Sequence, residues 1–356
     1  MVAHAQRILT VTHDEPDDEA AARPRRPRLR FGLALVGTVV AAELLARVLG
    51  PFLPPPNAGL PAELDRQLER IEARREPIDT FIVGASELAV GVDPAALADG
   101  SDAVGAAHTV WLAGIGADTI GALALDVVLE REEPARLIVG LTSREANGAD
   151  RFRAGRDGAL LGSPAYRAMS GELGALDRLE RAASQVSALV RDRDRLRRPL
   201  EIARHVVRNG TAEVPMLEID EYGMHTDRLD IDRYAESPAH LEQERQAMAG
   251  YRLDVDALAE LEVVLAAAQA DGVEVVLVQL PVYERHYLAL QPGLTERDAA
   301  FVTATEQLAE RAGIRYLDAR GELDWDDPTL WADVNHLNGN GTARLTDWLV
   351  DRLDAA

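Results

Sequence analysis

The sequence predicts an α/β fold, in which a parallel β-sheet is covered by helices on both faces. Short apolar runs that are typical of buried strands alternate with longer stretches of helical periodicity between residue 77 and the end of the chain. This alternation is typical of parallel sheets whose strands are joined by helices. The length of 356 residues, of which 47% are hydrophobic, allows one large domain or two smaller ones.

The charge and the amino-acid composition exclude several classes of ligand. The net charge is −22, and the acidic excess lies outside residues 1–30. Such a surface repels nucleic acid and anionic lipid head groups, so we expect neither as a ligand of the main domain. The absence of cysteine excludes disulfides, a thiolate nucleophile and cysteine-ligated metals. The eight histidines lack ligand spacing such as H-x-x-x-H, so we expect no metal and no cofactor.

The N-terminal region predicts a membrane anchor. Residues 1–30 are polar and end in a basic cluster, which predicts a disordered cytoplasmic tail. Residues 31–50 would span roughly 30 Å as a helix, so we expect a single transmembrane helix with the rest of the chain outside the cytoplasm. Glu43 and Arg47 are unusual in such a helix, but their spacing lets them pair. A cleaved signal peptide and a buried or interfacial helix are the alternatives.

Residues 51–76 are predicted to link the anchor to the folded domain. Residues 51–56 are rich in proline, which ends the helix and makes a stiff spacer. Residues 62–75 have the pattern of a charged amphipathic helix, which we interpret as a stalk on the membrane side. The folded domain is therefore expected to cover residues 77–356.

Within this domain the elements follow one another in α/β order. Strands are predicted at residues 80–83, 109–112, 136–141, 273–280 and 314–317. Helices are predicted at residues 119–130, 253–270, 297–312 and 342–353. Residues from about 150 to 250 interrupt this order with a charged, helical insertion, which includes a long helical stretch at about 172–207. The sequence leaves open whether the insertion is a lid over a site or serves only for packing.

Two motifs carry candidate chemistry, and they lie at opposite ends of the domain. Ser86 follows the first strand after Gly84 and Ala85, whose small side chains allow a tight turn that exposes a hydroxyl group. Asp333 precedes His336 by three residues, a spacing that lets the carboxylate orient the imidazole as a general base. Each motif alone is also compatible with a plain turn or a helix cap. Because reactive groups gather at the carboxyl ends of parallel strands, we expect the three side chains to meet.

These motifs resemble those of the SGNH (GDSL-like) hydrolase superfamily. The segment 84–94 (Gly-Ala-Ser, then Gly-Val-Asp-Pro) is similar to the first block of membrane-anchored members, and the segment 333–341 is similar to the last block. The resemblance covers roughly residues 78–353 and is specific only at these two ends. It implies a flavodoxin-like, three-layer α/β/α fold with Ser86 as nucleophile, His336 as base and Asp333 as its partner.

The resemblance is weaker in the middle blocks, which supply the oxyanion hole. It implies backbone donors at Ser86 and in the turn at Gly116 and Ala117, where Ala117 stands at the position of the usual glycine. Arg144 stands where the family has an asparagine, and its guanidinium could donate to the oxyanion or pair with Glu145 or Asp150. Losing one oxyanion donor typically costs on the order of 3–4 kcal/mol.

The resemblance implies an extracytoplasmic, membrane-tethered serine esterase or O-acyltransferase of the cell envelope. Its relatives act on acyl esters, and several add or remove O-acetyl groups on exported polysaccharides or cell-wall polymers. The expected partners are therefore an acylated carbohydrate or a small ester, the membrane through the N-terminal helix, and for transfer a membrane-bound acyl-transfer protein. The alternative is a catalytically inactive relative that binds glycan or serves as a scaffold for a membrane complex, and the departures at Ala117 and Arg144 favour it.

Overall fold

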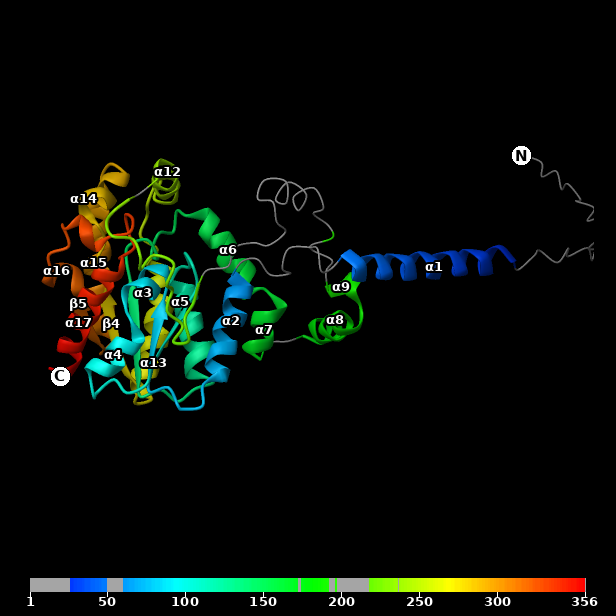
Figure 1. Cartoon of the computed structure of the whole chain (residues 1–356), viewed down its shortest axis with the longest axis horizontal. Coiled ribbons are helices and arrows are strands. Elements are labelled where there is room, and N and C mark those ends of the chain that lie inside the picture. The colour runs from blue at the N-terminus through cyan, green and yellow to red at the C-terminus, as the bar shows by residue number, and fades with distance from the viewer. Residues whose placement is uncertain are drawn as a thin grey trace, which may run out of the picture.

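The computed structural model describes residues 26–49, 60–171, 174–191, 196, 218–235 and 237–355. The predicted tail up to residue 25 and the proline-rich spacer at residues 51–56 lie outside the described residues, as does much of the predicted helical stretch after residue 191. The chain forms an α/β domain and, at one side of it, a long N-terminal helix (Figure 1).

The domain is built on a five-stranded sheet in which every strand pair is parallel. Its strands are β1 (Thr80–Gly84), β2 (Ala107–Trp111), β3 (Arg136–Leu141), β4 (Glu274–Gln279) and β5 (Arg315–Asp318). The order β2-β1-β3-β4-β5 is that of a flavodoxin-like sheet, in which the direction of winding reverses between β1 and β3. All five strands were predicted; the predicted ends were shifted by up to two residues.

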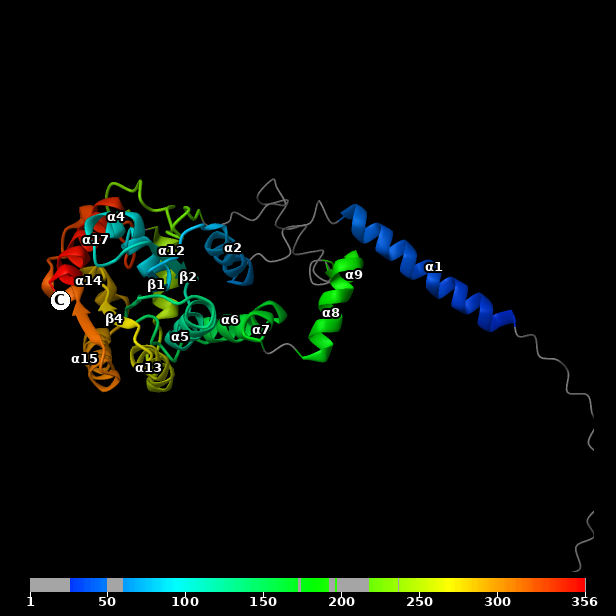
Figure 2. The same cartoon turned by 90° about the horizontal axis from the view of Figure 1, so that it is seen from below.

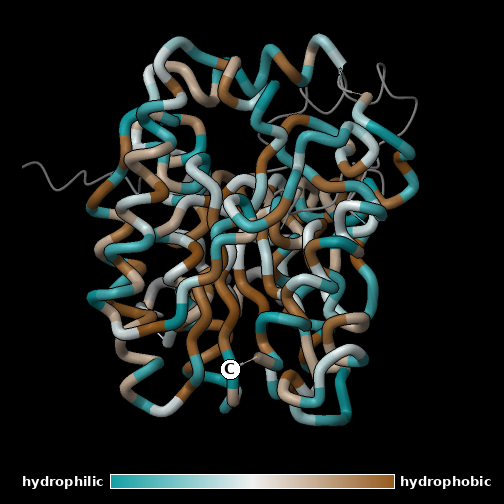
Figure 3. The backbone as a smooth tube through the Cα atoms, turned by 90° about the vertical axis from the view of Figure 1, so that its left-hand side faces the viewer, coloured by the Kyte–Doolittle hydropathy of each residue, from teal (hydrophilic) through white to brown (hydrophobic). Residues whose placement is uncertain are grey.

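Helices cover both faces of the sheet and complete three layers, which confirms the predicted fold class. One face packs against α2 (Leu60–Ala73), α5 (Ala117–Leu123), α13 (Val255–Ala270) and α15 (Leu294–Ala312). The other face packs against α3 (Ser86–Gly91), α4 (Pro94–Gly100) and α17 (Gly339–Asp354). Figure 3 shows the strands as apolar segments at the centre of the domain. Because both faces are covered, the strands have continuous apolar runs instead of alternating apolar and polar residues.

Helix α2 corrects the predicted boundary of the domain. Leu60, Leu64 and Ile71 of α2 are buried in the same apolar cluster as β1 and β2. Spacings of four and seven residues place these side chains on one face of the helix, and that face lies on the sheet. The folded unit therefore begins with α2 and not near residue 77, and α2 is a layer of the domain instead of a free stalk.

The helix predicted at residues 119–130 begins as α5 and continues as a π-helix, η2 (Ala124–Leu129). The amide of Glu130 donates to the carbonyl of Leu125, five residues earlier, which is the bond that defines this wider turn. The shorter helices near the end of the domain are α14 (Glu284–Tyr287), η3 (Leu288–Leu290), α16 (Ala319–Glu322) and η4 (Pro328–Leu330).

The insertion is largely helical where the structure describes it. It contains α6 (Arg151–Leu161), α7 (Pro164–Met169), α8 (Ala175–Val186), α9 (Ala188–Arg191) and α12 (Pro238–Ala247). The segment at residues 218–235 is irregular and lies along the edge of the sheet, where the amide of Thr109 in β2 donates to the carbonyl of Tyr222. The amide of His225 likewise donates to the carbonyl of Ala89 in α3.

The N-terminal helix α1 (Arg26–Leu49) lies outside the domain (Figure 2). Within it, Phe31–Leu49 is long and apolar enough to cross a membrane, and only 6% of this stretch is buried in the structure. Length and composition therefore agree with the predicted anchor, and a signal sequence would have the same properties.

Candidate active site

Ser86 lies at the carboxyl end of β1, where the strand turns directly into α3. The turn requires a residue without a side chain at position 84, because a Cβ atom there would lie 2.7 Å from Leu88 Cδ2 and 3.2 Å from the carbonyl oxygen of Gly140. Gly84 thereby lets α3 start close to β3, at the point between β1 and β3 where the winding of the sheet reverses. Ligand sites of open α/β sheets form at such points.

Asp333 and His336 lie in a tight turn between η4 and α17. The amide of Ala332 donates to the carbonyl of His336, and an isolated bridge between Trp331 and Leu337 closes the base of the turn. Asp333 Oδ1 accepts hydrogen bonds from the amides of Asn335 (3.1 Å) and His336 (2.9 Å). The carboxylate is thus fixed by the backbone of its own turn before it meets the imidazole.

The structure brings the three predicted side chains into one hydrogen-bonded chain. His336 Nδ1 lies 2.8 Å from Asp333 Oδ1, and His336 Nε2 lies 2.9 Å from Ser86 Oγ. Since an ionised carboxylate only accepts, we assign the imidazole proton to Nδ1 and the accepting lone pair to Nε2. The Ser86 hydroxyl can therefore donate to His336. All three residues are buried, with 3–7% of their surface exposed, so water competes weakly for these bonds.

His336 is held in its neutral form. Burial is the largest influence and lowers the pKa of the imidazole to about 3, and the cations of Arg228 and Arg144 act in the same direction. Glu87 and Glu244 act against them. A neutral imidazole at pH 7 is able to accept the serine proton, which a general base requires.

Arg228 was not predicted as part of the site. Its guanidinium forms an ion pair with the carboxylate of Asp333, the residue that faces His336 Nδ1. The pair offsets the negative charge that would otherwise favour the imidazolium. Arg228 belongs to the segment at residues 218–235, so the insertion contributes directly to the site and does more than pack beside it.

Glu87, the residue after Ser86, is the second group that the sequence did not reveal. Its Oε2 atom lies 3.2 Å from Ser86 Oγ, and its Oε1 atom accepts from Asn335 Nδ2 (2.5 Å) and Arg144 Nη1 (3.1 Å). Burial by itself would raise the pKa of this carboxyl, but the charge of Arg144 above all, together with the neighbouring imidazole of His336 and a bond from its own amide, lowers it to about 2. An ionised carboxylate therefore lies beside the serine hydroxyl.

Arg144 lies between two buried glutamates. Its second terminal nitrogen, Nη2, contacts Glu244 Oε1 of α12 at 3.1 Å, and these charges raise its pKa further despite burial. The sequence suggested Glu145 or Asp150 as an ion-pair partner, which is wrong. Glu145 accepts from the amide and hydroxyl of Thr142, and Asp150 accepts from two amides at the start of α6. Burial and the charge of Glu87 raise the pKa of Glu145 to about 8, so it is mostly protonated at pH 7.

The two backbone amides that were predicted to donate to the oxyanion donate to protein acceptors in this structure. The amide of Gly116 donates to Asp157 Oδ2 (2.8 Å), and the amide of Ala117 donates to the carbonyl of Glu145 (3.0 Å). Ser86 is the first residue of α3, where a backbone N–H has no carbonyl partner within the helix. Of the predicted backbone donors, Ser86 is therefore the one that is best placed to receive an oxyanion.

No metal site is apparent among the residues that the structure describes: they contain no group of three or more potential ligands. His225 is close to the site but has a structural role, since its ring stacks on Trp111 at a centroid distance of 4.8 Å and its Nε2 bonds to Asp227 (3.0 Å).

Comparisons with known proteins give few parallels. No family model matches the sequence, and no curated protein matches it significantly. Among solved structures, the chain is similar to a candidate acylhydrolase from Bacteroides fragilis NCTC 9343, with 9% identity and a TM-score of 0.42. The similarity covers 83% of this chain and 97% of the other. We draw no conclusion about activity from a likeness this distant.

Proposed function

We propose that this protein is a serine esterase or O-acyltransferase that acts outside the cytoplasm, with Ser86 as nucleophile, His336 as general base and Asp333 as the group that orients it. The observation that carries the proposal is the continuous chain of bonds from Asp333 Oδ1 to His336 Nδ1 (2.8 Å) and from His336 Nε2 to Ser86 Oγ (2.9 Å). A serine hydroxyl is a weak nucleophile until a base accepts its proton, and the base here is neutral and aligned.

In the first half of the reaction, the Ser86 proton moves to His336 Nε2 while Oγ forms a bond to the acyl carbonyl carbon. The carbonyl oxygen becomes an oxyanion, which the Ser86 amide stabilises. Collapse of this intermediate breaks the bond to the leaving alcohol, and the alcohol takes the proton from His336 Nε2. Asp333 stabilises the imidazolium that exists between these two transfers.

In the second half, an acceptor hydroxyl gives its proton to His336 Nε2 and attacks the acyl-serine, and Ser86 is regenerated when the proton returns. Water as acceptor gives hydrolysis, and a carbohydrate hydroxyl gives transfer. The resemblance to membrane-tethered SGNH enzymes favours acetyl esters of a carbohydrate or cell-envelope polymer as substrates. For transfer, it favours a membrane-bound acyl-transfer protein as the partner.

In this proposal Arg144 offsets the charge of Glu87 instead of serving as a free oxyanion donor. Its guanidinium is bound to Glu87 and Glu244, so it would stabilise the oxyanion only if the oxyanion replaces one of these carboxylates. Glu87 is adjacent to Ser86 and its negative charge opposes oxyanion formation, while Arg144 offsets that charge. We therefore expect slow turnover compared with an enzyme that has two or three free oxyanion donors.

Labelling with a fluorophosphonate probe tests the nucleophile, because the probe modifies only an activated serine. We expect labelling of the wild type, loss of labelling in Ser86→Ala and His336→Gln, and full labelling in the matched control Ser170→Ala, whose serine lies in the turn after α7. Acetate release from an acetyl ester should likewise persist in the wild type and in Ser170→Ala and be lost in Ser86→Ala and His336→Gln. Equal labelling of wild type and Ser86→Ala would refute the proposal.

One observation favours the second candidate, an inactive domain that binds glycan or organises a membrane complex. The amides of Gly116 and Ala117 and the guanidinium of Arg144 all have protein partners, which leaves few donors for an oxyanion. An intact protein that neither reacts with the fluorophosphonate nor releases acetate would favour this candidate.

A further inference from the structure

Two charged residues in the apolar helix α1 have specific partners in the insertion. The carboxylate of Glu43 accepts hydrogen bonds from Ser187 Oγ (2.8 Å) and from the amides of Ala188 (2.9 Å) and Leu189 (3.1 Å). It thereby caps the start of α9, whose first amides have no partner within the helix. Arg47 bonds to Glu43 and donates from Nη2 to the carbonyl of Val186 (2.8 Å). The junction of α8 and α9 is thus fixed to α1.

Helix α8, which this junction holds, is amphipathic along its whole length. At about 100° per residue its apolar residues fall within an arc of about 120°. These residues are Ala175, Leu176, Leu179, Ala182, Ala183 and Val186. The remaining positions carry two arginines, one aspartate, one glutamate, a serine and a glutamine, so the side chains of α8 have no net charge.

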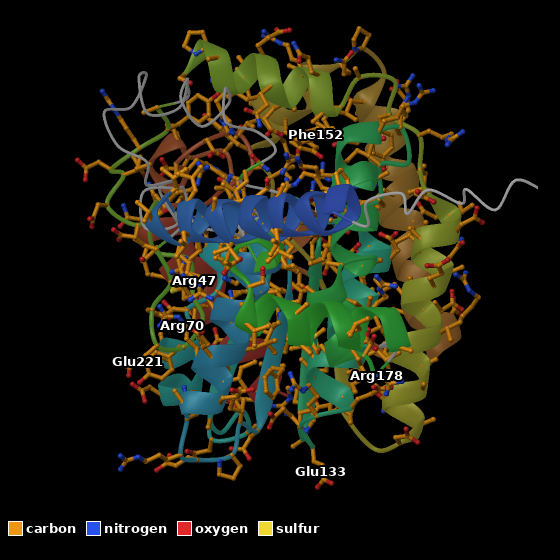
Figure 4. The ribbon with its side chains drawn as sticks, turned by 90° about the vertical axis from the view of Figure 1, so that its right-hand side faces the viewer. Arg47, Arg70, Glu133, Phe152, Arg178 and Glu221 are labelled. Atoms are coloured by element: carbon orange, nitrogen blue, oxygen red, sulfur yellow. The ribbon has the colours of Figure 1, made fainter. Side chains whose placement is uncertain are left out.

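The apolar face of α8 is not covered where the structure describes it. Leu179 is 66% exposed and Val186 is 72% exposed, and both lie on the same face of the helix; apolar residues that gather on one exposed face mark a binding surface. Figures 1 and 2 show α8 and α9 beside α1 and away from the sheet. Figure 4 looks onto this side of the molecule and shows Arg47 on α1 and Arg178 on α8.

The position of the junction along α1 indicates what covers this face. Glu43 lies six residues before Leu49, the last residue of α1, which corresponds to about 9 Å along the helix axis. Amphipathic helices that bind membranes lie about 5–10 Å into the boundary between head groups and acyl chains. A helix attached at the level of Glu43 would therefore lie at this boundary if α1 crosses the bilayer.

We propose that α8 is an interfacial membrane helix, which lies in the lipid surface with Leu179 and Val186 towards the acyl chains and is attached to the membrane-spanning helix through Glu43 and Arg47. The occupant of the apolar face is lipid and not another protein, because the face lies beside α1, whose apolar side chains are exposed and which is long enough to cross a membrane. The arrangement gives the two charged residues within the apolar stretch Phe31–Leu49 a structural role, which a cleaved signal helix would not need. It is independent of the proposed chemistry at Ser86.

The neutral charge of α8 determines how it binds. Electrostatic attraction to anionic lipids requires an excess of basic residues, which α8 lacks, and the domain to which it belongs is strongly acidic. Burial of apolar side chains must therefore supply the binding. We expect α8 to insert equally into vesicles of phosphatidylcholine alone and into vesicles that also contain phosphatidylglycerol.

Spin labels on the full chain in such vesicles test the proposal. The natural sequence has no cysteine, so Leu179→Cys, Val186→Cys and the control Arg178→Cys each carry one label, and all three sites are exposed. We expect labels at 179 and 186 to collide more often with oxygen than with a water-soluble nickel complex, and the label at 178 to show the reverse. The measurement reads depth and needs no enzyme activity.

Three outcomes would overturn the proposal. Equal nickel accessibility at 179 and 178 would mean that the apolar face is in water. Dipolar broadening at 179 that disappears on dilution with unlabelled protein would mean that a second copy covers it. Insertion only in the presence of phosphatidylglycerol would mean that charge, and not the apolar face, binds the membrane.

Discussion

Lowering the pH from 7 to 5 should leave the ester hydrolysis that we propose almost unchanged, because His336 stays neutral over this range. With a pKa of about 3, about 99% of the imidazole is neutral at pH 5. An ordinary histidine with a pKa near 6.5 would be about 76% neutral at pH 7 and only about 3% neutral at pH 5, so the rate would fall about 25-fold. The two cases therefore differ by more than the error of any kinetic assay.

The structure also indicates which residue to change. Burial lowers the pKa of His336 most, and the positive charge of Arg228, which also pairs with Asp333, is the next cause. In Arg228→Gln the carboxylate of Asp333 is no longer offset and favours the imidazolium, so the pKa of His336 rises. The acid limb of the profile should then move to higher pH, and activity at pH 5 should fall while activity at pH 7 changes less.

The assay is kcat/KM for acetate release between pH 3 and 8, with tryptophan fluorescence at each pH to show that the protein is folded. Arg233→Gln is the matched control, since it removes an exposed arginine from the same segment. A wild-type midpoint near 6.5 would refute the assignment of a buried neutral base. A midpoint in Arg228→Gln that stays in place or moves to lower pH would refute the role of Arg228.

Three further predictions concern the fold and the anchor. Gly84→Ala should destabilise the domain by about 1–3 kcal/mol in urea unfolding because of the contact with Leu88, whereas Gly155→Ala, with open space around it, should not. His108 is fully buried, and burial lowers its pKa to about 3, below the unfolded value, so stability falls as the pH drops below about 6.5. The decline in unfolding free energy from pH 7 to 5 should be about 2 kcal/mol smaller in His108→Phe. Glu43→Ala should increase the mobility of a spin label at position 179, while Thr38→Ala, elsewhere on α1, should not.

The parts of the fold that the sequence predicted are those whose signal is local. All five strands appear as apolar runs followed by polar turns, and Ser86 and His336 follow from short motifs at such turns. Helix α2 was assigned to the domain only by the structure. Its apolar stripe was visible, but its many charged residues suggested a free stalk, and the surface that the stripe covers is formed by strands further along the chain.

The site residues that the sequence did not predict make their contacts with segments far away along the chain. Arg228 is 105 positions from Asp333, and Glu244 is 100 positions from Arg144. Both lie in a charged insertion in which every acid or base is an equally good candidate partner. Glu87 stands beside the nucleophile in the sequence, but a glutamate in the first turn of a helix usually interacts with the helix dipole. Only the approach of Arg144 and Asn335 from other loops gives it another role.

The insertion therefore sets the electrostatics of the site as well as its shape. Without Arg228 the Asp333 carboxylate would raise the pKa of His336, and without Glu244 the charge of Arg144 would act on the site more strongly. Each contact comes from a different part of the insertion, residues 218–235 and α12, and both meet at the carboxyl ends of β1 and β3. A third part, α8 and α9, binds α1. A movement of the insertion relative to the sheet would thus change the protonation of the base, which makes the pH profile of Arg228→Gln informative about the insertion as a whole.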